Sequence, residues 1–266
     1  MAERVPRSGR AGGSGAPPPQ VIHELVRAAA AAPSLHNTQP WRFWVRDGGS
    51  VIELFADPAR MLTVADPDGR AAHIACGAAL FNLRLAAAVA GLRPDIRLLP
   101  DPGRPLLLAE LRLVGTGQVA APWERELHAA IERRQSNREP YSTRPVSPEA
   151  RAELAEAASA EGAVFHFLER DEALRVRRLA ADAELSLLAD PAYRAEVARW
   201  VGGERDSDGV PDRGSRTSHA SAVSSGWVSG QQEIPRLVAV SQTRCSACPA
   251  ASQFRAPPAR TDRTAS

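Results

Sequence analysis

The sequence predicts an α+β protein in which antiparallel strand pairs accompany one long central helix. Two observations indicate this class. A hairpin pattern, in which a Gly-rich turn joins two apolar runs, covers residues 42–56. A stretch of about 20 residues, from 71 to 90, is apolar on several faces and is typical of a buried helix. At 266 residues, with 44% hydrophobic residues, the chain is long enough to bury a real core.

The composition argues against several functional classes. The net charge is +2 and charges of both signs are mixed along the chain, so no nucleic-acid partner is expected. No run of 18 apolar residues suggests a membrane span. Three cysteines do not form a disulfide framework, and the N-terminus lacks the apolar region of a secretory signal. A cytoplasmic protein is therefore expected.

The first part of the chain shows a regular order of elements. Residues 1–20, which are rich in Gly, Pro, Ser and Arg, predict a disordered leader. Ile22, Leu25 and Ala29 then share one helical face. The elements expected after the leader are a helix from 21 until Pro33, a loop at 33–41, strands at 42–45 and 51–56, a helix at 71–90 ended by Gly91, and strands at 96–99 and 106–114.

A second segment opens at Pro122 and is richer in helices. Ser147-Pro148 and Asp190-Pro191 are helix starts in which a capping side chain precedes a proline. Asp171 is expected to cap a third helix. The predicted elements are helices at 123–134, 148–160, 171–188 and 191–201, with a strand at 164–168.

Residues 212–266 differ from the rest of the chain. They contain a single leucine, Leu237, and no helical period, so they are expected to lie outside the packed fold. Residues 237–240 are the one stretch expected to pair, as an edge strand. Cys245 and Cys248 have the spacing of half a zinc site, but no second ligand pair follows, so the spacing is interpreted as coincidence.

Two polar stretches are candidates for a binding site. In the loop 33–41, the side chains of Ser34, Asn37 and Gln39 offer donors and acceptors that suit the edge of a planar heterocycle. The alternative is a polar connection with Trp41 as a core anchor, and the residues alone favour it.

The second stretch follows the first helix of the second segment. Arg134, Ser136 and Arg138 offer two guanidinium groups around a hydroxyl, an arrangement that suits a phosphate. The alternative is a solvated basic helix end, which the helix dipole favours and which is again the stronger reading of these residues alone.

Together these stretches resemble a known family. The run from Ile131 through Arg134, Ser136, Arg138 and Pro140-Tyr141, followed by Pro145-Val146-Ser147-Pro148-Glu149, resembles the opening of FMN-dependent nitroreductases. The loop APSLHNTQPW and the helix at 77–92 resemble later segments of the same family. Because the phosphate motif here follows the loop, the chain is most similar to the Acg-type nitroreductase-like proteins of actinobacteria over residues 21–211.

The resemblance implies a nitroreductase-like α+β fold with a mixed or antiparallel sheet and two degenerate halves, at 21–120 and 121–211, of which the second is incomplete. It implies FMN as cofactor and NAD(P)H as electron donor, with a nitroaromatic or quinone-like acceptor. Arg134, Ser136 and Arg138 would hold the phosphate. Ser34, Asn37 and Gln39 would contact the ring or the ribityl chain. The flavin N5 atom would carry the chemistry, with no catalytic side chain and no metal.

Several alternatives remain open at this level. The flavin is expected across an intramolecular pseudo-dimer interface, or in a homodimer if the second half is incomplete. The function is an oxidoreductase, a flavin-sequestering protein without turnover, or an inactive remnant. Full Acg-type chains continue past the position of Gly209, so residues 212–266 are either a true extension or the product of an altered reading frame.

Overall fold

The computed structural model describes residues 16–115, 117–137, 142, 144–211 and 238–242. These form two compact units, which we describe separately. The first unit runs to Ser136 and includes Asp206–Gly209, and the second comprises Asn137–Arg205 and the chain from Val210 onward. Most of the predicted leader, Arg138, and the cysteine pair of the tail lie outside the described residues. The division into sequence halves at 120/121 stays a prediction.

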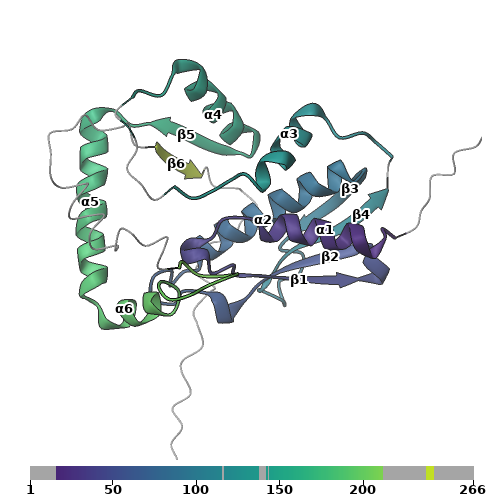
Figure 1. Ribbon diagram of the computed structural model, residues 1–266, viewed down its shortest axis with the longest axis horizontal. Helices are drawn as coiled ribbons and strands as arrows, with labels where there is room; N and C mark the ends of the chain where they lie inside the picture. The colour runs from purple at the N-terminus through teal and green to yellow at the C-terminus, as the bar shows by residue number, and fades with distance from the viewer. Residues whose placement is uncertain (1–15, 116, 138–141, 143, 212–237, 243–266) are drawn as a thin grey trace, which may run out of the picture. The chain divides into compact units, whose positions relative to one another are not determined.

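The first unit is a four-stranded antiparallel sheet with helices packed against it, in the strand order β1-β2-β4-β3. Figure 1 shows α1 and α2 side by side along this sheet. The elements are α1 (Pro19–Ala30), β1 (Trp41–Arg46), β2 (Val51–Ala56), α2 (Arg70–Val89), β3 (Leu92–Leu98), β4 (Leu107–Gly115) and α3 (Pro122–Ile131), with short 3-10 turns at Leu35–Asn37, Asp47–Gly49 and Pro58–Arg60. The α+β class, with an antiparallel sheet and a long helix, is confirmed.

The core of the first unit lies between α2 and one face of the sheet. Ile52 and Leu54 of β2 and Leu111 of β4 alternate toward this face and meet Leu83 of α2. All four side chains are essentially removed from solvent. By length and hydropathy α2 is also a candidate membrane span, but half of that window is buried in the structure, as expected for the central helix of a core.

Both ends of α2 are fixed by local signals. The Asp66 carboxylate accepts hydrogen bonds from the backbone N–H groups of Ala71 and Ala72, at 3.0 and 2.9 Å. These donors have no partner within the helix, and a negative charge there also suits the helix dipole. At the other end Gly91 adopts φ +74°, the left-handed conformation in which glycine stops a helix, so the predicted stop is confirmed.

The second unit contains α4 (Pro148–Ala160), β5 (Ala163–Phe167), α5 (Arg170–Ala189), α6 (Pro191–Ala198) and β6 (Val238–Gln242). The predicted helix starts are confirmed: Ser147 Oγ accepts from the Ala150 N–H at 3.2 Å, and Asp190 Oδ1 accepts from the Ala192 N–H at 2.8 Å. Strand β6 pairs antiparallel with β5 along all five residues. The pairing segment expected at 237–240 is therefore a strand, which begins one residue later and ends two residues later than predicted.

Several boundaries differ from the sequence prediction, among them the end of α3, at Ile131 instead of Arg134. Strand β3 starts at Leu92, four residues early, because its Pro94 lies on an edge strand, where a missing N–H is tolerated. Helix α5 is capped by Glu169, whose N–H donates to Glu172 Oε2 at 3.2 Å, instead of by Asp171. Helix α6 ends at Ala198 because Val201 leaves it to bridge Val210.

Candidate functional site

The loop between α1 and β1 is held in an unusual backbone conformation. His36, Asn37 and Gln39 adopt φ values of +50°, +54° and +51°, which side chains other than glycine rarely adopt. Ser34 stabilises the loop: its carbonyl accepts from the Asn37 N–H at 3.0 Å and its hydroxyl accepts from the Gln39 N–H at 2.9 Å. Such strain is often found at binding sites, so the loop is a candidate on geometric grounds as well.

A distant segment of the same unit, Asp206–Gly209, lies against this loop. Asn37 Nδ2 donates to the Gly209 carbonyl, and the Gly209 N–H donates back to the Asn37 carbonyl, both at 3.1 Å. Gln39 Nε2 donates to the Ser207 carbonyl. Within the described residues, the side-chain amide groups of Asn37 and Gln39 each donate one hydrogen bond to this segment. Their side-chain carbonyl oxygens remain available to accept hydrogen bonds from other partners.

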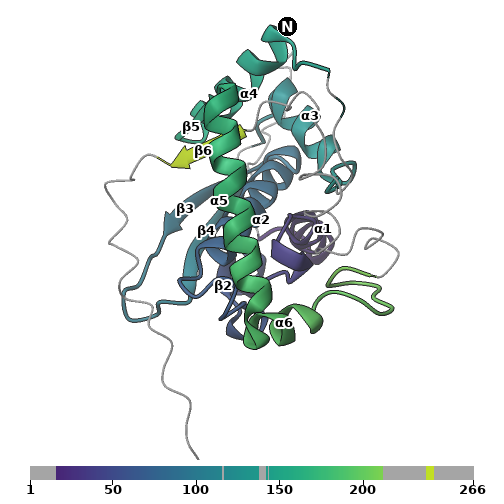
Figure 2. The same ribbon diagram turned by 90° about the vertical axis from the view of Figure 1, so that its left-hand side faces the viewer.

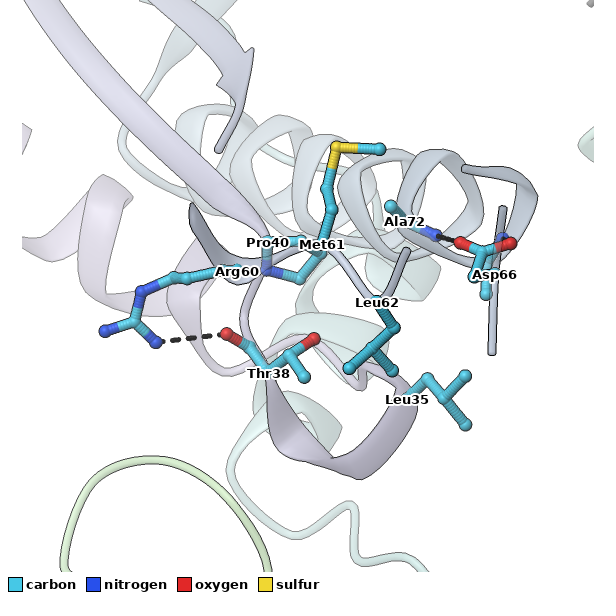
Figure 3. A pocket seen from close by; sticks show the side chains of 9 residues that line it. Leu35, Thr38, Pro40, Arg60, Met61, Leu62, Asp66 and Ala72 are labelled. Atoms are coloured by element: carbon cyan, nitrogen blue, oxygen red, sulfur yellow. Dashed lines mark hydrogen bonds between the residues drawn. The ribbon is translucent and has the colours of Figure 1, made fainter. Parts of the chain in front are cut away.

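Arg60 joins the loop to the same segment, and sequence reasoning missed it. Its Nη1 donates to the Thr38 carbonyl at 3.0 Å and lies 3.1 Å from Asp208 Oδ2. Figure 3 shows the Arg60–Thr38 contact beside a hollow of about 10 Å³, the room of one water molecule, whose lining includes Met61 and Leu62. No sequence pattern distinguishes Arg60 from the chain's many other arginines.

The end of the loop is anchored in the core. Trp41 is buried, so the predicted core-anchor role is confirmed. Cys76 of α2 donates from Sγ to the Pro40 carbonyl at 3.3 Å. Burial raises the pKa of the Cys76 thiol to about 12, so the group stays a neutral donor. Cys76 is buried in the core cluster of the first unit, so it acts as a packing residue.

The residues that follow α3 reach the start of the loop. Arg134 Nη2 lies 3.4 Å from the carbonyl of Ala31, three residues before Ser34, and Arg134 Nη1 lies 3.5 Å from Ser136 Oγ. Both side chains are exposed, and both contacts are long for hydrogen bonds. Arg134 therefore reaches the entry of the loop at 33–41, which we call the amide loop, and Ser136 lies beside Arg134. Arg138 lies outside the described residues.

Helix α3, which Arg134 follows by three residues, is fixed to the edge strand β3. Glu124 Oε1 accepts from Arg93 Nη1 at 2.7 Å, and Glu124 Oε2 accepts from the Ala121 N–H at 2.7 Å. The hydrogen bond from Arg93 is the main reason that the pKa of Glu124 lies below its ordinary value. This contact positions the segment after α3 relative to the sheet.

A groove of about 600 Å³ lies between α1, the C-terminal part of α2, and α3. Its volume falls in the range of small-molecule sites. The walls are mostly apolar, and the Arg27–Glu132 ion pair, at 2.5 Å, joins α1 to α3. Lining residues include Leu25, Ala28, Ala31, Ala86 and Ile131. Since Ala31 is also the residue that Arg134 reaches, the apolar groove ends beside a cation and a hydroxyl.

Comparisons with known proteins find similarity to one family. A model described as "Nitroreductase family" matches residues 7–68, which include the amide loop. The chain is 35% identical over 209 residues to "Putative NAD(P)H nitroreductase Rv3131" and 31% identical over 215 residues to "Putative NAD(P)H nitroreductase acg", both from Mycobacterium tuberculosis. These matches cover 77% and 81% of this chain, and the chain spans 58% and 63% of the two relatives.

Solved structures of similar description also match part of the chain. One is "a putative nitroreductase in complex with fmn" from Desulfovibrio desulfuricans, with 25% identity, 40% of this chain and 79% of that chain covered, and a TM-score of 0.31. Another is a "Nitroreductase Family Protein" from Streptococcus pneumoniae, with 18% identity, 41% and 85% coverage, and a TM-score of 0.32.

Proposed function

We propose that this chain, which is similar to proteins of the nitroreductase family, binds FMN and acts as an NAD(P)H-dependent oxidoreductase. One observation carries the proposal: Arg134 reaches the entry of the strained amide loop, with Ser136 beside it, although about 100 residues separate Arg134 from that loop in sequence. Arg134 and Ser136 thus belong to the same compact unit as the loop, and the contact of Arg134 with Ala31 supports the proposal.

The available side chains fit the cofactor. A phosphate needs cationic and hydroxyl donors, and Arg134 and Ser136 are exposed with only long contacts, so they are available to bind it. We propose that Arg138 completes this set. The loop offers the Asn37 and Gln39 amides to the ring or ribityl chain. The role of Ser34 is to hold the loop, since its hydroxyl accepts from the Gln39 N–H.

Bound FMN would supply hydride acceptance and electron transfer, and the chain's own residues bind and orient it. Arg134 fixes the phosphate end by charge. The left-handed loop fixes the other end, and Arg60 and Cys76 hold that loop to its surroundings through the carbonyls of Thr38 and Pro40. The apolar residues of the groove beside Arg134 would bury part of a ligand bound there. We propose a nitroaromatic or quinone-like compound as the acceptor.

A second candidate function is flavin sequestration without turnover. The segment Asp206–Gly209 favours it, because its carbonyls already accept from the Asn37 and Gln39 amides. A segment in that position would restrict access of a second substrate to the loop. The predicted pseudo-dimer arrangement of the flavin site remains a prediction.

Two measurements on the purified full chain test these functions. Flavin absorbance after purification with added FMN measures binding, and we expect a stoichiometric complex. Steady-state oxidation of NAD(P)H with a quinone separates oxidoreductase from sequestration. A complex that forms but does not turn over supports sequestration, and a chain that binds no FMN contradicts both.

A further inference from the structure

Asp57, the residue directly after β2, carries a buried charge in the first unit. Its side chain is only 6% exposed, and two arginines approach the same oxygen of it: Arg42 Nε lies 2.8 Å and Arg60 Nε lies 3.9 Å from Oδ2. A carboxylate removed from water needs such partners, because its desolvation is costly. Figure 2 shows the sheet of this unit from the side, and Figure 3 shows the second partner, Arg60, donating to the Thr38 carbonyl of the amide loop.

The backbone of Asp57 holds the end of that loop. Its N–H donates to the Pro40 carbonyl at 3.0 Å. Its Oδ1 accepts from the Ala59 N–H at 3.1 Å, and its carbonyl accepts from the Arg60 N–H at 3.0 Å, so Asp57 also shapes the 3-10 turn that carries Arg60. Asp57 therefore links the end of the loop to the turn after β2.

These contacts lie on both sides of one residue, Gln39. Arg60 holds the Thr38 carbonyl before it. Asp57 holds the Pro40 carbonyl after it. Gln39 itself has φ +51°, a conformation that is unfavourable for a side chain other than glycine and persists only where the surroundings impose it. The direction in which the Gln39 amide points thus depends on the two contacts.

We propose that Asp57 is a positioning residue of the flavin site: its charge orients Arg60, and the two residues together hold Gln39 in the left-handed conformation that presents its amide to the flavin. In this arrangement Asp57 affects flavin affinity without touching the flavin. The inference rests on the proposed function, because it takes the Gln39 amide as a contact of the bound cofactor.

The variant Asp57→Asn separates the charge of this residue from its shape. Asparagine has the same size and keeps the backbone N–H and one side-chain oxygen, so mainly the attraction for the two arginines is lost. We expect FMN and riboflavin to bind about three- to tenfold more weakly, the range of one ordinary hydrogen bond. In a Gln39→Ala background the same substitution should lower neither affinity further, because Asp57 acts through that amide.

Glu53, in the middle of β2, provides a matched control. It is also a buried carboxylate between two arginines, since Arg46 Nη1 and Arg104 Nη1 lie 2.8 and 3.1 Å from its Oε1. Neither arginine belongs to the amide loop or to the turn after β2. Glu53→Gln should therefore lower stability as Asp57→Asn does, but leave both flavin affinities unchanged.

Backbone hydrogen exchange measured by NMR without flavin gives a second readout. The Gln39 N–H, which donates to Ser34 Oγ, should exchange faster in Asp57→Asn than in the parent chain or in Glu53→Gln. Unchanged exchange of this N–H in Asp57→Asn, an equal loss of affinity in Glu53→Gln, or full additivity with Gln39→Ala would overturn the proposal. A parent chain that binds no flavin contradicts the proposed function instead, and the exchange comparison then decides whether Asp57 holds the loop.

Discussion

Helices α2 and α5 have the same length, 20 residues, but they relate to their surroundings in opposite ways. Nine residues of α2 are buried, and Ala79, Leu83 and Ala87 have no exposed surface. In α5 Ala173 alone is buried, and several leucines are exposed. The four strands of the first unit give α2 a broad apolar face to pack on, whereas the described strands of the second unit are β5 and β6.

The difference shows that helical periodicity and packing are separate properties. Both helices have apolar residues at helical spacing, but burial depends on the sheet available to receive them. The described candidate residues Ser34, Asn37, Gln39, Arg134 and Ser136 all belong to the first unit, with the well-packed helix. Stability and flavin binding should therefore depend on the first unit.

The largest expected effect is on stability. Leu83→Ala in α2 should lower the free energy of unfolding by about 2–5 kcal/mol, because it leaves a cavity in a packed core. The matched change in α5, Leu185→Ala, should cost less than about 0.5 kcal/mol, because that side chain is already mostly in water. Urea denaturation of both variants measures the difference. Equal losses would mean that α5 is packed in solution.

Thiol chemistry provides a second contrast between the helices. Burial raises the pKa of Cys76 to about 12, so at pH 8 its labelling by iodoacetamide should be at least about 100-fold slower than in the denatured chain. A cysteine placed by Ala183→Cys on α5 should react quickly. Both measurements are made with Cys245→Ser and Cys248→Ser present. Fast labelling of Cys76 in the folded chain would show that α2 opens readily.

The same shift predicts how stability depends on pH. The unfolded thiol ionises near pH 8.5, whereas the folded thiol stays neutral until about pH 12. Between these values the unfolded state binds fewer protons, so this group's contribution to stability falls as pH rises. Comparing urea midpoints of the parent chain and Cys76→Ala from pH 8 to higher pH tests this: the parent should lose more stability than the variant.

The sequence predicted elements far better than contacts. The Asp190-Pro191 and Ser147-Pro148 starts, the stop at Gly91 and the 42–56 hairpin depend on neighbouring residues, and each was placed correctly. The bonds of Asn37 and Gln39 to Asp206–Gly209 could not be predicted, because they join positions more than 165 residues apart. Backbone carbonyls accept these bonds, and they carry no side-chain signal.

The amide loop gives a smaller, specific effect on binding. The double variant Asn37→Ala/Gln39→Ala should weaken FMN and riboflavin alike, by about tenfold, because both ligands share the ring and the ribityl chain. Fluorescence titration with each ligand measures it. An unchanged affinity for FMN and riboflavin would show that the two amides do not contact the flavin and that they bind only the segment Asp206–Gly209.

The smallest expected effect follows from shortening the chain. A chain that stops at Pro211 keeps every described residue of the first unit but lacks β6, the partner of β5. We expect its main melting transition and its FMN affinity to stay within error of the full chain. Loss of FMN binding in the shortened chain would show that the site needs residues 212–266.

The most direct test of the central claim, that Arg134 holds the FMN phosphate, compares Arg134→Ala with Arg133→Ala. The two arginines are adjacent and exposed, but Arg133 Nε donates to the Ala129 carbonyl of the preceding helix, α3, whereas Arg134 reaches the entry of the amide loop. Calorimetric titration of Arg134→Ala should show FMN affinity reduced about tenfold or more and riboflavin affinity nearly unchanged, with both affinities preserved in Arg133→Ala. Equal losses of FMN and riboflavin in Arg134→Ala, or an equal loss of FMN in Arg133→Ala, would contradict it.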